Sequence, residues 1–261
     1  MNAEPDVFST PAVAAAFVWA NGPAGRLLQS RTLQPLATHG FTTRDLSFRG
    51  DRAAGDKARL ADVMGVTPGG VITVRQVHGR EVAMVTPGTV LPESTGADAV
   101  VSTDPSRAIA VRTADCVPIL IADTNRRVVA AVHAGWKGTA AGVAAATVAA
   151  IEDLGVSASS LVAAIGPSIG ACCYQVDARV RTAFLAATPD SAEWFAEDGP
   201  GHWRLDLWRA NFDQLVKAGV PAESIHVSRL CTSCHPDWFP SYRRDGQGAG
   251  RIAGVIRAAV R

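Results

Sequence analysis

Short apolar runs separated by turn residues recur along the whole chain and predict a mixed α/β fold. Two β-branched runs, 117–122 and 128–132, flank the polar stretch 124–127 and predict a hairpin or two adjacent strands. Similar runs predict further strands over 12–19, 36–42, 71–77, 81–85, 97–102, 108–112, 161–166 and 225–230. Helices are predicted over 57–64, 139–154, 176–187 and 205–218, three of which end just before glycine.

The bulk properties fit one layered domain over residues 1–261, with residues 1 to about 10 expected to be loose. Apolar residues make up 48% of the chain and the net charge is +1, which argues against disorder and against nucleic-acid binding through bulk charge. No apolar run is long enough to span a membrane. The short run 13–20 follows Glu4 and Asp6 rather than basic residues, so a signal peptide is not expected. We therefore expect a cytoplasmic protein with reduced cysteines.

Three side chains at the ends of predicted strands form the main candidate site. Cys116 begins one strand of the predicted hairpin and His133 ends the other, so an antiparallel pairing brings them together. A third run, 71–77, ends at His78 and is followed by glycine, as the run before His133 is followed closely by Gly135. Two histidines and one cysteine can hold a catalytic zinc with an open position, and the same set occurs in blue-copper sites. Taken singly, each residue is more often a buried or hydrogen-bonded core residue.

Several strings then identify a family. RQVHG, TADCVPIL, HAGWKGT, GPSIGACCYQV and FPSYRRDGQGAGR resemble the YfiH family, from about Phe41 to near the C-terminus. Its members have been called laccase-like polyphenol oxidases, purine nucleoside phosphorylases and peptidoglycan editing factors. The resemblance implies a metal, usually zinc, at His78, Cys116 and His133. It also implies a layered α/β/β/α-type fold like that of the cytotoxic necrotizing factor cysteine hydrolases. The loop after Arg44 is shorter here than is usual in the family.

The matching strings also contain the candidate phosphate-binding residues Arg44, Lys137 and Arg243, since a phosphate needs one or two cations and backbone N–H donors. Residues 135–139, at a predicted helix start, could supply those donors. Asp115 could accept a hydrogen bond from a metal-bound histidine, orient water, or simply occupy a turn.

Four hypotheses follow for the function. The leading one is a zinc enzyme that acts on adenosine, guanosine, inosine and methylthioadenosine, by phosphorolysis or, for adenosine, by deamination through a metal-activated water. A copper-dependent phenol oxidase ranks lower, because six histidines with no H-x-H string suit a multicopper cluster poorly. A hydrolase with Cys116 as nucleophile and His133 as base would suit editing of peptidoglycan precursors. A non-catalytic metal-binding module is the last. The leading hypothesis makes small molecules, a purine nucleoside and phosphate, the partners, and leaves the oligomeric state undetermined.

A second cysteine motif, Cys231-x-x-Cys234-His235, matches the attachment pattern of c-type haem. Haem attachment of that kind belongs to exported proteins, which this chain is not expected to be. The two residues could also bind a structural zinc, but no second C-x-x-C pair exists, and Cys172 and Cys173 are adjacent. The sequence therefore favours reduced structural cysteines over an auxiliary metal.

Overall fold

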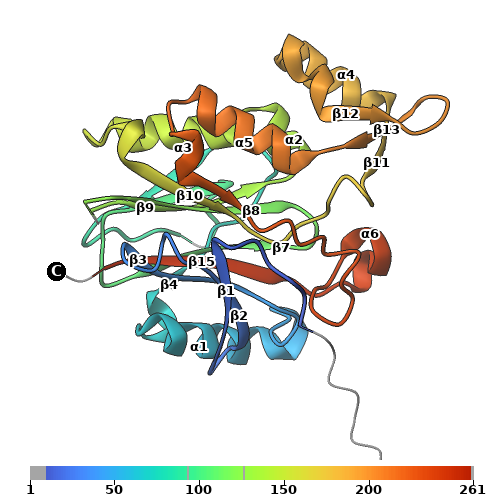
Figure 1. Cartoon of the computed structure of the whole chain (residues 1–261). Coiled ribbons are helices and arrows are strands. Elements are labelled where there is room, and N and C mark those ends of the chain that lie inside the picture. The colour runs from blue at the N-terminus through green and yellow to red at the C-terminus, as the bar shows by residue number, and fades with distance from the viewer. Residues whose placement is uncertain (1–9, 93, 126, 260–261) are drawn as a thin grey trace, which may run out of the picture.

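The computed structural model describes residues 10–92, 94–125 and 127–259. Two six-stranded sheets pack face to face, with helices covering their outer faces (Figure 1). This arrangement confirms the mixed α/β class. The residues 1–9 that were expected to be loose lie outside the described residues. None of the described helices is long and apolar enough to cross a membrane.

The first sheet has the order β1-β2-β3-β15-β7-β4. The C-terminal strand β15 lies in its middle and pairs antiparallel with β3 and β7, while the short β4 runs parallel to β7 at one edge. The strands of this sheet are β1 (Phe17–Gly22), β2 (Gly25–Ser30), β3 (Ala37–Thr42), β4 (Val71–Ile72), β7 (Ala108–Thr113) and β15 (Ile252–Ala258).

The second sheet has the order β14-β10-β8-β9-β6-β5 and contains the predicted hairpin, β8 and β9, at its centre. Its outermost neighbours are parallel, β14 to β10 and β5 to β6, and the inner pairs are antiparallel. Its strands are β5 (Val82–Val85), β6 (Ala99–Ser102), β8 (Val117–Asp123), β9 (Val129–Ala134), β10 (Leu161–Ile165) and β14 (Ile225–Val227).

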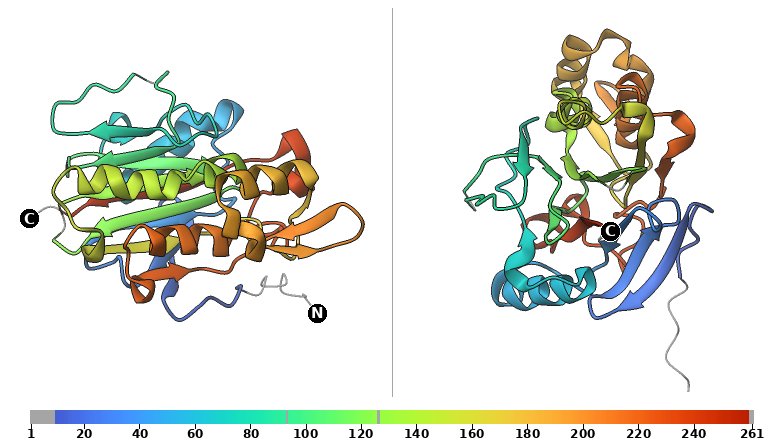
Figure 2. Two further views of the ribbon diagram at one scale, coloured as in Figure 1. Left: turned by 90° about the horizontal axis from the view of Figure 1, so that it is seen from above. Right: turned by 90° about the vertical axis from the view of Figure 1, so that its left-hand side faces the viewer.

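Helices flank the two sheets on opposite sides. Helix α1 (Ala53–Met64) covers the first sheet, while α2 (Trp136–Ala140), α3 (Val143–Glu152) and α5 (Leu207–Lys217) lie over the second (Figures 1 and 2). Figure 2 shows α3 and α5 side by side when the molecule is seen from above. A small third sheet, of order β11-β13-β12, adjoins α4, and α6 lies near the C-terminal strand; these elements are β11 (Gln175–Asp177), α4 (Ala178–Ala187), β12 (Phe195–Glu197), β13 (His202–Leu205) and α6 (Tyr242–Asp245).

Apolar side chains fill three layers, one between the sheets and one under each set of helices. Strand β8 shows how one sequence serves two of these layers, since successive side chains of a strand point to opposite faces. Val117, Ile119 and Ile121 pack toward the helices, while Leu120 and Ala122 pack toward the first sheet. A strand buried on both faces reads as a continuous apolar run, as this hairpin does in the sequence.

Three predicted elements differ from the structure. The strand predicted over 12–19 is found as β1, Phe17–Gly22. The helix predicted over 139–154 is split into α2 and α3 at Gly142, whose φ of 81° is left-handed and interrupts the helical hydrogen bonds. The strand predicted over 71–77 is paired only at Val71–Ile72 and by an isolated bridge at Arg75, and β5 belongs to the other sheet. The chain between β4 and β5 therefore crosses from one sheet to the other and carries His78 at that crossing.

Candidate metal centre

Two loops and the central hairpin bring His78, Cys116 and His133 together. The register pairs Pro118 with His133, so Cys116, just before β8, lies beside the end of β9. His78 approaches from the crossing between the sheets, with its ring centroid 4.8 Å from that of His133 and nearly perpendicular to it, at 83°. One ring nitrogen from each histidine and the Cys116 Sγ all lie within 4.8 Å of one another. The structure thus groups the three residues that the sequence singled out.

Asp98 holds this group in position, and we did not predict that role. It is fully buried just before β6, the strand that pairs with β9. Its carboxylate accepts hydrogen bonds from the backbone N–H groups of Val77 (3.2 Å), His78 (2.9 Å) and Gly79 (2.6 Å). It also lies 2.8 Å from Nδ1 of His133. The only sequence signal was an aspartate directly before a buried strand, and its proximity to both histidines depends on strand order.

The carboxylate of Asp98 also fixes how His133 is presented. An Nδ1–H donated to Asp98 leaves Nε2 free to face Cys116 or a metal, as is usual for histidine ligands. His78 has a left-handed backbone with φ of 60°, which is uncommon for a residue other than glycine. The three N–H donors of 77–79 that converge on Asp98 stabilise this conformation.

The three side chains also shift one another's protonation. Burial raises the pKa of the Cys116 thiol, but attraction and hydrogen bonding to His133 and His78 outweigh it and lower the pKa to about 6. Burial lowers the pKa of His133, but the Cys116 thiolate and Asp98 raise it to about 9. Burial opposes ionisation of Asp98 too, and the donors from His133, Gly79 and His78 hold its pKa below the usual range. Without a metal, a thiolate and an imidazolium are therefore expected near neutral pH.

A glycine leaves room for the three donors. A Cβ on Gly135 would lie 2.8 Å from Cys116 Sγ and 3.3 Å from Cδ2 of His78. Its φ of −73° suits any residue, so the close approach, and not the backbone conformation, explains a glycine here. A thiolate and two imidazole nitrogens around such a gap are a donor set suited to zinc or copper.

A cavity of about 760 Å³ opens onto these residues. Four arginines contribute to its walls, and no acidic residue is found among the described residues that line it. Buried Thr113 offers a hydroxyl that has no hydrogen-bond partner within the described part of the chain. The walls comprise Phe48, Arg49, Arg75, Gln76, Arg112, Thr113, Ala114, Tyr242, Gln247, Ala249 and Arg251.

Asp115 does not make the histidine contact that we considered for it. Its carboxylate accepts hydrogen bonds from Thr232 Oγ1 (2.6 Å), Ser241 Oγ (3.0 Å) and the backbone N–H of Arg243 (2.6 Å). The contact to His133 is made by Asp98 instead, because Asp98 directly precedes β6, which pairs with β9, and the Asp115 carboxylate faces the segment 232–243. Asp115, which directly precedes Cys116, therefore connects the segment 232–243 to that residue.

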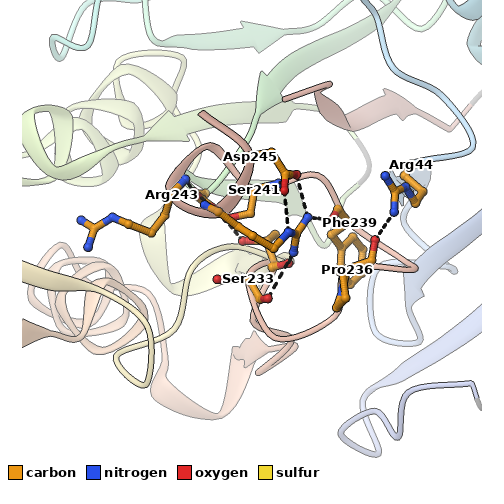
Figure 3. A network of polar contacts seen from close by, with 10 residues as sticks. Arg44, Ser233, Pro236, Phe239, Ser241, Arg243 and Asp245 are labelled. Atoms are coloured by element: carbon orange, nitrogen blue, oxygen red, sulfur yellow. Dashed lines mark hydrogen bonds and ion pairs between the residues drawn. The ribbon is translucent and has the colours of Figure 1, made fainter. Parts of the chain in front are cut away.

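The three cations expected to bind phosphate are not among the residues that line the cavity. The guanidinium of Arg44 donates to the carbonyl of Pro236 (Figure 3). Arg243 extends away from Ser241 and Asp245 in Figure 3, donates to the carbonyl of Gln175 and lies over the ring of Tyr174. Lys137 is exposed, with its Nζ 5.7 Å from the ring centroid of Trp136.

Sequence reasoning missed the arginines that do line the cavity. Arg112 is the exposed residue near the end of β7, and Arg251 directly precedes β15, its neighbour in the first sheet. Arg49 lies in the short loop after Arg44. Arg251 is the last residue of the string FPSYRRDGQGAGR and Arg112 directly precedes TADCVPIL, but only the pairing of β7 with β15 places them at one opening.

The chain matches known proteins over most of its length. Residues 40–259 match the family described as multi-copper polyphenol oxidoreductase laccase. The purine nucleoside phosphorylase YlmD of Geobacillus stearothermophilus is 36% identical over 213 residues, which is 77% of each chain. A purine nucleoside phosphorylase of Streptomyces coelicolor is 39% identical over 196 residues, covering 75% of this chain and 78% of the relative.

Solved structures agree with this assignment. The hypothetical protein YfiH of Bacillus licheniformis has a TM-score of 0.84 and 30% identity, covering 94% of this chain and 100% of that one. YlmD from Geobacillus stearothermophilus has a TM-score of 0.80 and 28% identity, covering 98% of this chain and 100% of that one. The chain therefore belongs to the laccase-like family that includes YfiH and YlmD.

Proposed function

We propose that this protein is a zinc-dependent purine nucleoside phosphorylase that uses adenosine, guanosine, inosine and methylthioadenosine, and that also deaminates adenosine. The observation that carries the proposal is a single cavity with the His78, Cys116 and His133 donors in its wall and arginines around them. Relatives named purine nucleoside phosphorylases support the reaction class.

The three donors fit a zinc ion. Their ligand atoms lie within 4.8 Å of one another, Asp98 orients His133, and Gly135 leaves the space between the donors free. A zinc ion held by His78, Cys116 and His133 would supply Lewis acidity to the reaction.

The chain's own residues bind and orient the two substrates. Arg49, Arg112 and Arg251 attract the phosphate, because guanidinium groups pair with phosphate oxygens in two parallel hydrogen bonds. The unpartnered Thr113 hydroxyl provides a further donor. Phe48 and Tyr242, which also line the cavity, present aromatic surface for the purine.

In phosphorolysis, a phosphate oxygen forms a bond to C1′ of the ribose while the bond from C1′ to the purine nitrogen breaks. The purine leaves with that electron pair and takes up a proton. In deamination, water adds to C6 of adenine and ammonia leaves, so phosphate is not consumed. The two reactions are therefore separated by their products and by their need for phosphate.

The first test incubates the purified protein with adenosine, with and without phosphate. We expect adenine and ribose 1-phosphate only when phosphate is present, and inosine in both conditions. The Cys116→Ala variant should lose both activities and the metal of this site while keeping its fold, measured by circular dichroism. Full activity in that variant with no metal at the site would contradict the proposal.

A second test compares two arginines. Arg112→Ala should raise the KM for phosphate about tenfold or more, since a charge-assisted hydrogen bond contributes roughly 1.5–3 kcal/mol. Arg44→Ala should leave that KM unchanged, because Arg44 is hydrogen-bonded to Pro236 and does not line the cavity. If the KM for phosphate rises in Arg44→Ala and not in Arg112→Ala, then Arg44 binds the phosphate and the proposal for Arg112 is wrong.

One observation favours a second candidate, a cysteine hydrolase. The lowered pKa of Cys116 and the raised pKa of His133 describe a thiolate–imidazolium pair, which is the ground state of many cysteine nucleophiles. This candidate leaves the position of His78 unexplained. It predicts that a thiol-alkylating reagent modifies Cys116 whether or not zinc is present, whereas zinc should protect Cys116 in the leading proposal.

The family description names copper oxidases, but the described residues fit a multicopper cluster poorly. Three or more possible metal-ligand side chains come together at two places among the described residues, and only one of the two groups contains histidine. Oxidation of phenols by a copper-loaded preparation that does not turn over nucleosides would support the oxidase.

A further inference from the structure

Four of the five cysteines meet at a second place in the fold. The Sγ atoms of Cys172, Cys173, Cys231 and Cys234 all lie within 4.8 Å of one another. Two of them follow β10 and two follow β14, and these strands are parallel neighbours. The two segments that follow these strands therefore leave the sheet at the same end. This brings together residues that are far apart in the sequence.

We propose that these four thiols bind a structural zinc ion, at a site separate from the His78 centre. The Sγ of Cys234 lies 3.6 Å from that of Cys172 and 3.4 Å from that of Cys173. Four thiolates at about 2.3 Å from a tetrahedral zinc are roughly 3.8 Å apart, whereas disulfide sulfurs are about 2.0 Å apart. The observed separations are close to the edge of a zinc tetrahedron and far from a disulfide.

Spacing in the sequence supports the same ligand set. Cys231-x-x-Cys234 is the usual spacing of one half of a zinc site. In the sequence, the adjacency of Cys172 and Cys173 argued against their binding one tetrahedral metal ion. In the structure, the Cys173 N–H donates to the carbonyl of Gly170 (2.9 Å), and this turn brings both sulfurs into the cluster.

The surrounding backbone is arranged for a cluster of sulfur ligands. The N–H of Gly170 donates to Cys231 Sγ at 3.3 Å, a contact that supports a thiolate ligand. A Cβ on Gly170 would lie 2.8 Å from the Trp208 ring and 3.3 Å from Cys172 Sγ. Glycine therefore allows the loop to approach the cluster this closely.

Two arginines, each also paired with an aspartate, flank the cluster and donate to the backbone of its two segments. Arg204 donates to the carbonyl of Cys172 at 3.0 Å, and Arg244 donates to that of Ser233 at 3.1 Å. Such a centre carries a net charge of about −2, and thiolates select zinc over magnesium or calcium.

The proposed ion would fasten both cysteine segments next to the first metal centre. The residue after Cys231, Thr232, donates its hydroxyl to Asp115 at 2.6 Å. On the other segment, the N–H of Ile169 donates to the carbonyl of Asp115 at 3.0 Å. Because Asp115 precedes Cys116, the four-cysteine site stabilises the loop that presents that ligand.

The test counts metal in the full-length protein, purified in the presence of zinc and freed of loosely bound ions. We expect about two zinc ions per chain in the wild type and about one in Cys116→Ala. The double variant Cys173→Ser/Cys234→Ser, which spares the buried Cys231, should also retain about one, and combining it with Cys116→Ala should leave none. The zinc that persists in Cys116→Ala tests this site without reference to nucleoside turnover.

Cobalt gives a readout that leaves all four cysteines of the cluster unchanged. Cys116→Ala loaded with cobalt should show the strong visible and charge-transfer absorption of a tetrahedral tetrathiolate. The proposal is overturned if Cys116→Ala contains no zinc and binds no cobalt in this way. It is also overturned if mass spectrometry of unreduced wild-type protein shows that these cysteines form disulfides.

Discussion

At the residue scale, the candidate metal centre depends on one carboxylate that receives four donors. Asp98 accepts from the backbone of 77–79 and contacts Nδ1 of His133, so it fixes both the loop that carries His78 and the ring of a second ligand. An asparagine at this position has one acceptor oxygen, and its NH₂ group would face one of these donors.

We therefore expect Asp98→Asn to lower zinc affinity at the His78 centre by about 10–100-fold. It should also destabilise the fold by about 3 kcal/mol, since it breaks a buried charged network. Asp104→Asn is the matched control, because Asp104 is also buried but bonds to Ser106 and Arg107. Zinc titration of both variants checks this, and equal losses of affinity would argue against a positioning role for Asp98.

A different histidine makes stability depend on pH. His39 is 1% exposed, and burial lowers its pKa to about 4. Its Nε2 accepts from the N–H of Ser30 at 2.8 Å, so the folded chain requires the neutral ring. Above the unfolded-state pKa both states are neutral, and as pH falls toward the folded-state pKa only the unfolded chain takes up the proton.

Because of His39, the free energy of unfolding should thus fall by about 2 kcal/mol as the pH is lowered from about 7 to about 5. His39→Gln should remove that part of the pH dependence, whatever its effect at neutral pH. Urea denaturation of both proteins at the two pH values measures the difference. A pH dependence that is identical in the variant and the wild type would show that His39 is not its source.

At the scale of elements, the hairpin and the turn that follows it build the centre. Strands β8 and β9 set Cys116 beside His133, and Gly135, the N-cap of α2, leaves space between the candidate ligands. A residue with a side chain could adopt the backbone conformation found at 135, but its Cβ would fill that space.

Gly135→Ala should therefore reduce zinc binding at the His78 centre by at least tenfold while the protein still folds, because the added methyl group displaces Cys116 or His78. Gly55→Ala provides the control, since a Cβ there has no atom within 4 Å in the described structure. Metal analysis and thermal unfolding of the two variants make the comparison. If Gly135→Ala binds as much zinc as the wild type, the metal does not need the space beside Gly135, and the prediction is wrong.

The sequence was sufficient to predict the hairpin, the helix that ends at Gly65 and the three candidate ligands, because each has a local signal. Continuous apolar runs with β-branched residues mark β8 and β9, and glycine in a left-handed conformation ends α1. The role of Asp98, the arginines of the cavity and the four-cysteine cluster were not predictable in this way. Each depends on which strands are neighbours, and β6, β7, β14 and β15 pair with partners distant in the chain.

At the scale of the whole molecule, Asp115 connects the C-terminal segment to the centre of the fold. Three donors from residues 232–243 converge on its carboxylate. This segment also supplies Tyr242 to the cavity wall and leads to Arg251. The C-terminal strand and the site are thus coupled through one buried acid.

Asp115→Asn should loosen this segment and lower the free energy of unfolding by roughly 1–3 kcal/mol, since an amide cannot satisfy all three donors. Asparagine tolerates the left-handed φ of 81° found at this position, so the backbone itself is not strained by the change. Hydrogen exchange should quicken over 232–243. In Asp177→Asn, which removes charge from the N-cap of α4, faster exchange should be confined to that helix.

The central claim is that zinc at His78, Cys116 and His133 supports purine nucleoside phosphorolysis, and metal reconstitution tests it most directly. Metal-free protein, wild type and Cys116→Ala, is loaded with zinc or with copper and assayed with adenosine plus phosphate and with a phenol. We predict adenine and ribose 1-phosphate from zinc-loaded wild type alone, and no phenol oxidation. Phenol oxidation by the copper-loaded wild type, with no nucleoside turnover under either metal, would contradict the account.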